Sequence, residues 1–150
     1  MKKYCILLSL LLIVFSSCQK ERAGQQAATD DANIQAFIAS SHMNATKDPS
    51  GLYYQVINAG TGTSPGASST ITATYTGFVP NGVYFATNLT LTSKLSSLIQ
   101  GWQIGLPHVK AGGTIILLIP SALGYGSTQV QDIPANSILV YNIVLNGVAN

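Results

Sequence analysis

Apolar and polar positions alternate along the second half of the chain in a way that predicts a β-sheet. Residues 52–57 form a short apolar and aromatic run that predicts a first strand. Along residues 70–76 every second side chain is apolar, which is typical of an antiparallel strand with one buried face. Asn81-Gly82 then favours a tight hairpin turn, so we expect residues 83–85 to return as the partner strand.

One helix is predicted among the later strands. Residues 98–106, which include the only tryptophan, form a helix-like segment that ends at Pro107. The apolar run at residues 114–119 and the segment at residues 137–145 predict two further strands. These elements predict an α+β fold, in which a twisted antiparallel sheet wraps around one short helix. About 100 residues suffice for one core of this kind.

The N-terminal residues are predicted to be a lipoprotein signal peptide, residues 1–17. A basic start at Lys2 and Lys3 precedes an apolar run, residues 4–15, which is short for a bilayer span. Small residues then lead to Cys18, as in a bacterial lipobox, so we expect cleavage before Cys18 and lipid attachment to it. An ordinary secretory signal, or a signal anchor with an incidental cysteine, is the alternative.

Residues 18–48 are predicted to be a lipidated tether that contains a short helix. Residues 19–29 have little apolar content and predict a flexible segment. Asp30 and Asp31 are acidic residues typical of a helix start, and the apolar spacing after them predicts a short helix to about Ser41. A turn then opens the globular domain, residues 49–150.

The residues around Cys18 also bear on location. Residues 18–21 resemble the short export tag of some surface lipoproteins of the Bacteroidetes, although ordinary solvated tether residues explain them equally well. The absence of Asp directly after Cys18 favours the outer membrane. We therefore expect a lipid-anchored protein of the bacterial cell envelope, on the periplasmic or the surface face.

Charge and cysteine content exclude several functions. Only 8% of the residues are charged, and beyond Pro49 only Lys94, Lys110 and Asp132 remain. A nucleic-acid partner is not expected, because it would need several basic residues against phosphate. Cys5 leaves with the signal and Cys18 is the predicted anchor, so the domain has no thiol for a disulfide, a nucleophile or a metal.

The histidines do not suggest a metal site or a hydrolase. His42 and His108 are far apart in the sequence and have no Cys, His or Asp cluster beside them. No nucleophile elbow is present, and no paired carboxylates follow Asp48. We expect no cofactor and no metal.

Short motifs in the domain occur in an order that identifies a family. Tyr-Thr-Gly lies at residues 75–77, Gly-x-x-Phe at residues 82–85, Ile-x-Gly-Trp at residues 99–102 and Tyr-Gly at residues 125–126. Ile-Pro and Leu-Val-Tyr follow near the C-terminus, at residues 133–134 and 139–141. Over residues 51–148 the chain resembles the FKBP family of peptidyl-prolyl cis-trans isomerases.

The resemblance implies an FKBP-like fold and an apolar pocket that accelerates rotation of X-Pro amides in extracytoplasmic polypeptides. It implies a Trp102 floor and aromatic walls, with the Ile99 amide and the Tyr125 hydroxyl as donors to a substrate carbonyl. Leu98 and Ala86 are expected to contact substrate. The residues expected to carry the reaction are Tyr75, Phe85, Ile99, Trp102, Tyr125 and Tyr141.

Two departures from the family pattern keep a second function open. Ala86 stands where the family usually has Asp. Residues 87–97 look shortened and lack the arginine that pairs with that Asp. The alternative is a catalytically weak or inactive module that binds Pro-containing or unfolded segments, as a chaperone or scaffold lipoprotein. A β-rich adhesin without a pocket fits the ordered motifs less well.

Overall fold

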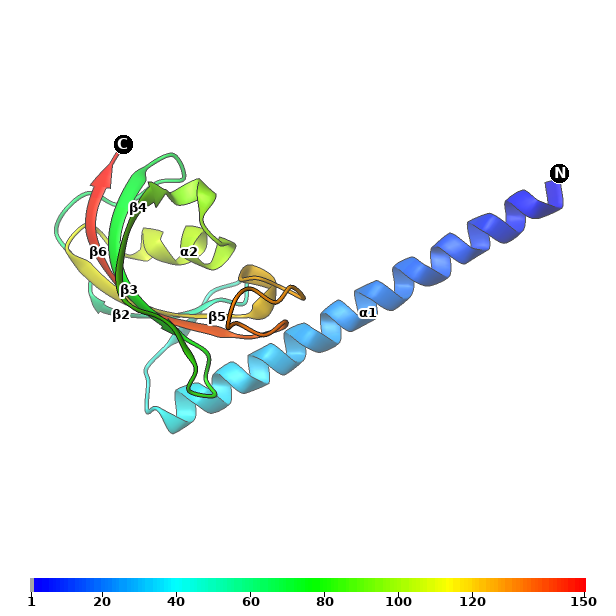
Figure 1. Cartoon of the computed structure of the whole chain (residues 1–150), viewed down its shortest axis with the longest axis horizontal. Helices are drawn as coiled ribbons and strands as arrows, with labels where there is room; N and C mark the ends of the chain where they lie inside the picture. The colour runs from blue at the N-terminus through cyan, green and yellow to red at the C-terminus, as the bar shows by residue number, and fades with distance from the viewer. Residues whose placement is uncertain (1) are drawn as a thin grey trace.

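The computed structural model describes the backbone of residues 2–150 and the side chains of residues 21–150. Its centre is a curled six-stranded sheet with the order β1-β2-β5-β6-β3-β4, in which all neighbours are antiparallel (Figure 1). The strands are β1 (Thr46–Lys47), β2 (Tyr53–Asn58), β3 (Thr70–Phe78), β4 (Tyr84–Lys94), β5 (Gly113–Ile119) and β6 (Leu139–Ala149).

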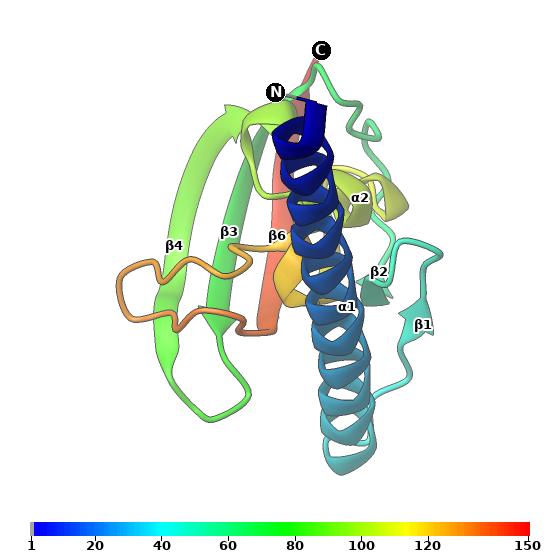
Figure 2. The ribbon, with the colours of Figure 1, turned by 90° about the vertical axis from the view of Figure 1, so that its right-hand side faces the viewer.

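Two α-helices lie on opposite faces of this sheet. The short helix α2 (Gln100–Gly105) lies in the concave face, and the last turns of the long helix α1 (Lys2–Ser40) pack against the other face (Figures 1 and 2). Single 3-10 turns complete the fold: η1 (Leu95–Ser97), η2 (Leu106–His108) and η3 (Ser121–Leu123). The α+β architecture predicted from the sequence is therefore confirmed.

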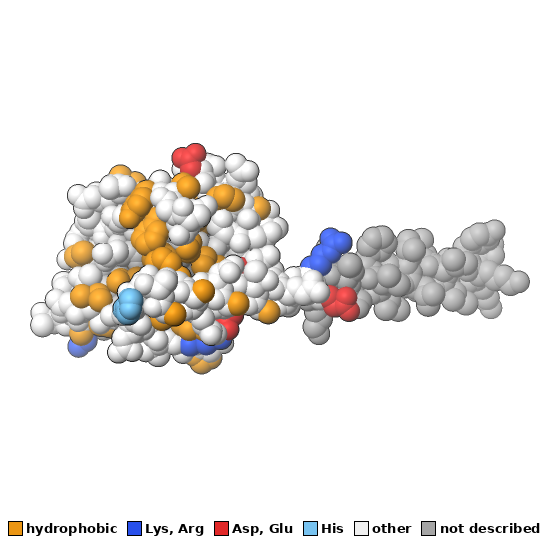
Figure 3. Space-filling view, turned by 90° about the horizontal axis from the view of Figure 1, so that it is seen from below, with side chains coloured by type: hydrophobic (Ala, Val, Ile, Leu, Met, Phe, Trp, Pro, Cys, Tyr) orange, Lys and Arg blue, Asp and Glu red, His pale blue; other side chains and the backbone are white. Residues whose placement is uncertain are grey.

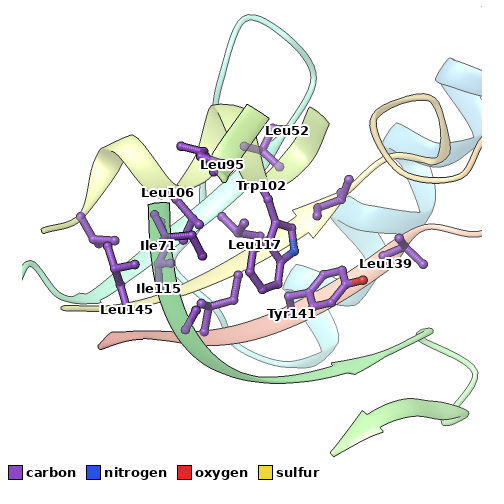
Figure 4. Close-up of a cluster of buried hydrophobic side chains, with 14 of the residues drawn as sticks. Leu52, Ile71, Leu95, Trp102, Leu106, Ile115, Leu117, Leu139, Tyr141 and Leu145 are labelled. Carbon is purple, nitrogen blue, oxygen red and sulfur yellow. The ribbon is translucent and has the colours of Figure 1, made fainter. Parts of the chain in front are cut away.

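The main core lies between α2 and the concave face. Alternate residues of β3, β5 and β6 point inward, so that Ile71, Leu117 and Ile143 are fully buried. Trp102 of α2 and Leu106 pack onto them (Figure 4). Each fully buried aliphatic or aromatic side chain of this kind contributes roughly 1.5–3 kcal/mol.

Two glycines let α2 approach the sheet closely. A Cβ atom at Gly101 would lie 2.5 Å from the Ile119 side chain, and one at Gly105 would lie 2.5 Å from that of Leu117. Any other residue would therefore push α2 away from β5. The close approach places Trp102 deep in the core, where it is only 3% exposed.

A second, smaller core joins α1 to the convex face. Ile34 is fully buried against Tyr53, Leu118 and Val140. Beside them, the buried Asp30 carboxylate accepts hydrogen bonds from the Ser121 amide at 2.8 Å and from its hydroxyl at 2.6 Å. The last turns of α1 are thus an integral part of the folded unit.

This packing corrects two sequence predictions for the N-terminal region. Residues 21–29, predicted to be flexible, belong to α1, whose Glu, Arg, Gln and Ala residues favour a helix. Asp30 does not cap a helix start but lies inside the helix and binds Ser121. The sheet begins at Thr46, three residues before the predicted domain boundary at residue 49, and that boundary stays a prediction.

The hairpin prediction is confirmed, but its second strand is longer than predicted. Gly82 has the positive φ that the turn requires, 92°. Beyond residue 85, β4 continues to Lys94, through a segment predicted to be a shortened connection. Threonine pairs bridge the two strands, with hydroxyl oxygens 2.9 Å apart in Thr72–Thr92 and in Thr74–Thr90.

The surface of the globular part carries little charge. Figure 3, seen from below the view of Figure 1, shows isolated charged side chains among polar and apolar ones. Among the residues that the structure describes, no helix has the length and apolar character needed to cross a membrane. The side chains of the predicted signal peptide and of Cys18 lie outside the part of the chain whose side chains are described.

Candidate active site

Four aromatic side chains from different elements meet at one end of the main core. Tyr75 of β3 and Tyr141 of β6 both lie edge-on to Trp102 of α2, and their ring centroids lie 5.1 Å and 5.3 Å from that of the indole. Phe85 of β4 contacts Tyr141 at 5.4 Å. Edge-to-face pairs at such distances are a favoured aromatic geometry, so the cluster is a specific packing. The structure brings together these four predicted pocket residues.

Strand register explains why the rings converge. Tyr75 lies on the inward face of β3, two residues before Gly77, and Gly77 is paired with Tyr141. A Cβ atom at Gly77 would collide with the Phe85 ring and lie 2.9 Å from Cε1 of Tyr141. The Phe85 and Tyr141 rings therefore occupy the space that a side chain at residue 77 would need.

The start of α2 holds Ile99, whose backbone amide is the predicted donor to substrate. Ile99 is the N-cap residue, with extended backbone, and its carbonyl accepts the amide of Trp102 at 3.0 Å. Within the described part of the chain, the Ile99 amide donates to no backbone or side-chain acceptor. Leu98 and Ile99 are both half-buried against the main core. A free amide N–H therefore lies three residues before Trp102, and its role as a donor to substrate stays a prediction.

Tyr125 approaches the cluster from the turn after η3. That turn is fixed by the Gly126 amide, which donates to the Ser121 carbonyl at 2.8 Å. Burial, and then the nearby Tyr125, raise the pKa of Tyr141. The same two causes raise the pKa of Tyr75. The phenols of the cluster consequently stay protonated and keep their hydrogen-bond donors.

Ala86 is buried beside the aromatic walls. It is 7% exposed and pairs with Gly77 in the β3–β4 register. No carboxylate replaces the family's Asp at this position. Since the arginine partner is also missing from residues 87–97, no unpaired buried charge is left there. Nowhere in the described residues do three or more His, Cys, Asp or Glu side chains gather as metal ligands would.

Two contributors to the site carry no sequence signal of their own. Leu123 packs against the main core beside Tyr125, although its turn has no regular apolar spacing. Asp30, which is distant in sequence, holds that turn through Ser121. Neither could be found without the fold, because Leu123 acts through the main core and Asp30 through a contact between α1 and the segment after β5.

The known proteins that this chain resembles include members of one family. The family model for FKBP-type peptidyl-prolyl cis-trans isomerase matches residues 62–146. FkpA of Escherichia coli, an FKBP-type peptidyl-prolyl cis-trans isomerase, is 41% identical over 99 residues, which is 63% of this chain and 37% of FkpA. The outer membrane protein MIP of Legionella longbeachae is 38% identical over 128 residues, which is 81% of this chain and 55% of MIP.

The fold agrees with these sequence matches. The crystal structure of Escherichia coli FkpA superposes with a TM-score of 0.70 at 32% identity, over 94% of this chain and 71% of that one. The chain spans less than half the length of the first curated relatives that it matches. The family model covers more than half of the chain, and the aromatic cluster lies where the family motifs predict it. The chain belongs to the family of FKBP-type peptidyl-prolyl cis-trans isomerases.

Proposed function

We propose that the protein is a peptidyl-prolyl cis-trans isomerase that acts on proline-containing polypeptides. The observation that carries the proposal is the cluster of Tyr75, Phe85, Trp102 and Tyr141, assembled from four elements in a domain of the isomerase family. A proline ring would pack on Trp102, and the other three rings would form the walls.

The physical argument rests on the electronic structure of the amide. Rotation about an X-Pro bond has a barrier of about 20 kcal/mol because the twisted amide loses its resonance. The twisted amide also has less charge separation than the planar one, so an apolar environment favours it relative to the planar form. Binding the twisted state better than the planar state is catalysis. The Ile99 amide and the Tyr125 hydroxyl would hold the substrate carbonyl while the proline stays fixed.

No titrating group is needed for this reaction. The pocket phenols, whose pKa values are raised, remain neutral donors at neutral pH. Activity should therefore be nearly constant between pH 6 and pH 8. A step by general acid or base catalysis would instead give a bell-shaped profile.

The test is NMR exchange spectroscopy on a short peptide that contains one Leu-Pro bond. We expect catalytic amounts of the protein to accelerate exchange well above background. Trp102→Ala should abolish the acceleration, but it also removes core packing. Tyr125→Phe is the milder variant, since it deletes only a hydroxyl from a half-buried side chain, and it should lower the rate severalfold without unfolding. No acceleration by the folded wild-type protein would refute the proposal.

Ala86 favours a second candidate, a module that binds Pro-containing or unfolded segments without isomerising them. Because Ala86 cannot hydrogen-bond Tyr75, that hydroxyl loses the partner that family members usually supply. Peptide chemical-shift changes without faster exchange would identify this function. A large gain in rate in Ala86→Asp would show that the natural pocket is a weakened isomerase.

We further propose that the protein acts in the cell envelope, attached through lipid at Cys18 and directed to the outer membrane. The lipobox-like residues before Cys18 support the anchor, and a relative named as an outer membrane protein supports the location. Labelling cells with a radioactive fatty acid should mark the wild-type protein but not Cys18→Ala. Equal labelling of both proteins would refute the anchor.

A further inference from the structure

A hollow lies between α1 and the segment that follows β5, apart from the aromatic cluster. It encloses about 1220 Å³. One side of α1 forms the first wall, residues 48–51 form the second, and the turn at residues 120–127 forms the third. In Figures 1 and 2 the segment after β5 lies against α1, as the contacts between α1 and η3 confirm. Small-molecule sites enclose about 300–1,000 Å³, so this cleft suits a longer ligand better.

One turn of the chain, residues 123–127, borders both the aromatic cluster and the cleft. Leu123 packs against the main core and also lines the cleft. Tyr125 of the same turn packs against the main core, whereas Gly126 and Ser127 line the cleft. A polypeptide with its proline on Trp102 would therefore have to pass only this turn to reach the cleft.

Buried hydrogen bonds hold two walls of the cleft, α1 and the turn, in a fixed relative position. Asp30 of α1 binds the amide and hydroxyl of Ser121 at 2.8 Å and 2.6 Å, and both residues line the cleft. Gln26 donates to the other oxygen of the same carboxylate at 2.7 Å. Hydrogen bonds to a buried charge are among the strong ones, so α1 and the turn hold a fixed relative position.

The chemistry of the lining suits a neutral peptide chain. The acidic side chains already have partners: Asp30 binds Ser121, Asp31 pairs with Lys47 at 2.6 Å, and Asp48 accepts the amide of Ser50. The remaining polar groups of the lining are mostly amides and hydroxyls, which can hydrogen-bond to peptide groups; examples are Gln25, Ser127 and Asn136. Apolar contact surface lies beside them, for example on Ala27, Pro49 and Pro120. Arg22 is the one cation of the lining without an ion pair among the described residues.

We propose that this cleft binds the segment of the substrate polypeptide that flanks the proline held at Trp102. The segment would be extended and largely uncharged. The protein would then prefer long unfolded chains to short peptides, and α1 would be part of the binding surface. This inference rests on the proposed function, because the occupant is defined as the flank of the same substrate.

The experiment uses two matched variants of the full chain. Ala27 lines the cleft, whereas its neighbour Ala28 does not, and both are exposed on α1. Ala27→Trp fills the cleft, and Ala28→Trp adds the same side chain to the same helix outside it. Neither residue touches the aromatic pocket. Isomerisation is measured by NMR exchange on two peptides with the same Leu-Pro bond, one of four residues and one of about 20 neutral residues.

We expect Ala27→Trp to raise KM for the long peptide at least fivefold and to leave kcat unchanged. The short peptide should be turned over as by the wild type, and Ala28→Trp should behave as the wild type with both peptides. An unchanged KM in Ala27→Trp, or the same rise in Ala28→Trp, overturns the inference. A change in sedimentation in Ala27→Trp without a change in KM also overturns it, and assigns the cleft to a second copy of the chain.

Failure of the proposed function is visible separately. If the wild-type protein accelerates neither peptide, the isomerase proposal fails, and affinity is measured from shift changes of the long peptide. Weaker binding in Ala27→Trp alone still supports the cleft as a polypeptide site, and equal binding in both variants overturns it.

Discussion

Gly77 is the position where a single methyl group should damage the site most directly. It is buried in β3, and the Phe85 and Tyr141 rings lie against its Cα. In Gly77→Ala the new Cβ would overlap the Phe85 ring and lie 2.9 Å from Tyr141. Carbon atoms pack best at about 3.5–4.0 Å, so Phe85 must retreat by roughly 1 Å and Tyr141 by roughly half as much.

The magnitude follows from two opposing effects. Overpacking a core costs about 1–3 kcal/mol, whereas replacing glycine by alanine recovers about 0.4–1 kcal/mol of chain entropy. We expect Gly77→Ala to lose about 1–2 kcal/mol of unfolding free energy. Because a displacement of about 1 Å in a catalytic site can cost 10²-fold, kcat/KM should fall at least tenfold.

Gly147 provides the matched control. It lies in β6, and a Cβ there would meet only the Thr72 Cβ at 4.0 Å, an ordinary contact. Urea unfolding followed by circular dichroism gives the stabilities, and NMR exchange gives the activity. Gly147→Ala should be as stable as the wild type or slightly more so, with full activity. The reasoning is refuted if Gly77→Ala matches Gly147→Ala in both measurements.

Three further outcomes follow from the structure. Asp30→Asn should lower the unfolding free energy by about 1–3 kcal/mol, because an amide replaces the buried carboxylate that binds Ser121; equal urea midpoints would contradict this. The Lys47 and Tyr53 hydrogen bonds lower the pKa of Asp31 below 3.8, so stability from this pair is present above that pH and is lost as the pH falls through the lowered pKa; acid titration of Asp31→Asn should show a shallower loss. Ala86→Asp should be destabilised by about 1–3 kcal/mol at pH 7 and less at pH 4, since a carboxyl buried there has a raised pKa; a loss independent of pH would contradict this.

Much of the sheet and of the pocket follows from local patterns in the sequence. Strict alternation in residues 70–76 places Tyr75 on the inner face, and Asn81-Gly82 fixes the hairpin that brings β4 back beside it. The motif order adds Trp102 and Tyr141, which no periodicity could have put in contact. The structure confirms the fold and brings these rings together, while their catalytic roles remain a proposal.

The N-terminal region shows where local patterns fail. Residues 21–29 are polar, which suggested flexibility, yet their helix propensity is high and α1 is anchored further on by Ile34. Asp30 looked like a helix cap because acidic residues are common there. Its actual partner, Ser121, is 91 positions away, and no local rule can supply a contact of that range.

An uncharged pocket with a cleft beside it would favour long polypeptide substrates over short peptides. The site has Ala86 in place of the family's Asp, and its walls are phenols and hydrocarbon, so the proposed pocket would contact mainly the proline ring and its carbonyl. A site with so few polar contacts gains little affinity from a short peptide, because each immobilised group costs entropy on binding. The turn at residues 120–127, which Asp30 holds against α1, adds a second surface that adjoins the aromatic cluster. That surface would bind the segment that flanks the proline and would not contact the reacting amide. It would lower KM for long unfolded chains and leave the rotation step unchanged, since contacts that are equal in the planar and twisted states do not raise kcat.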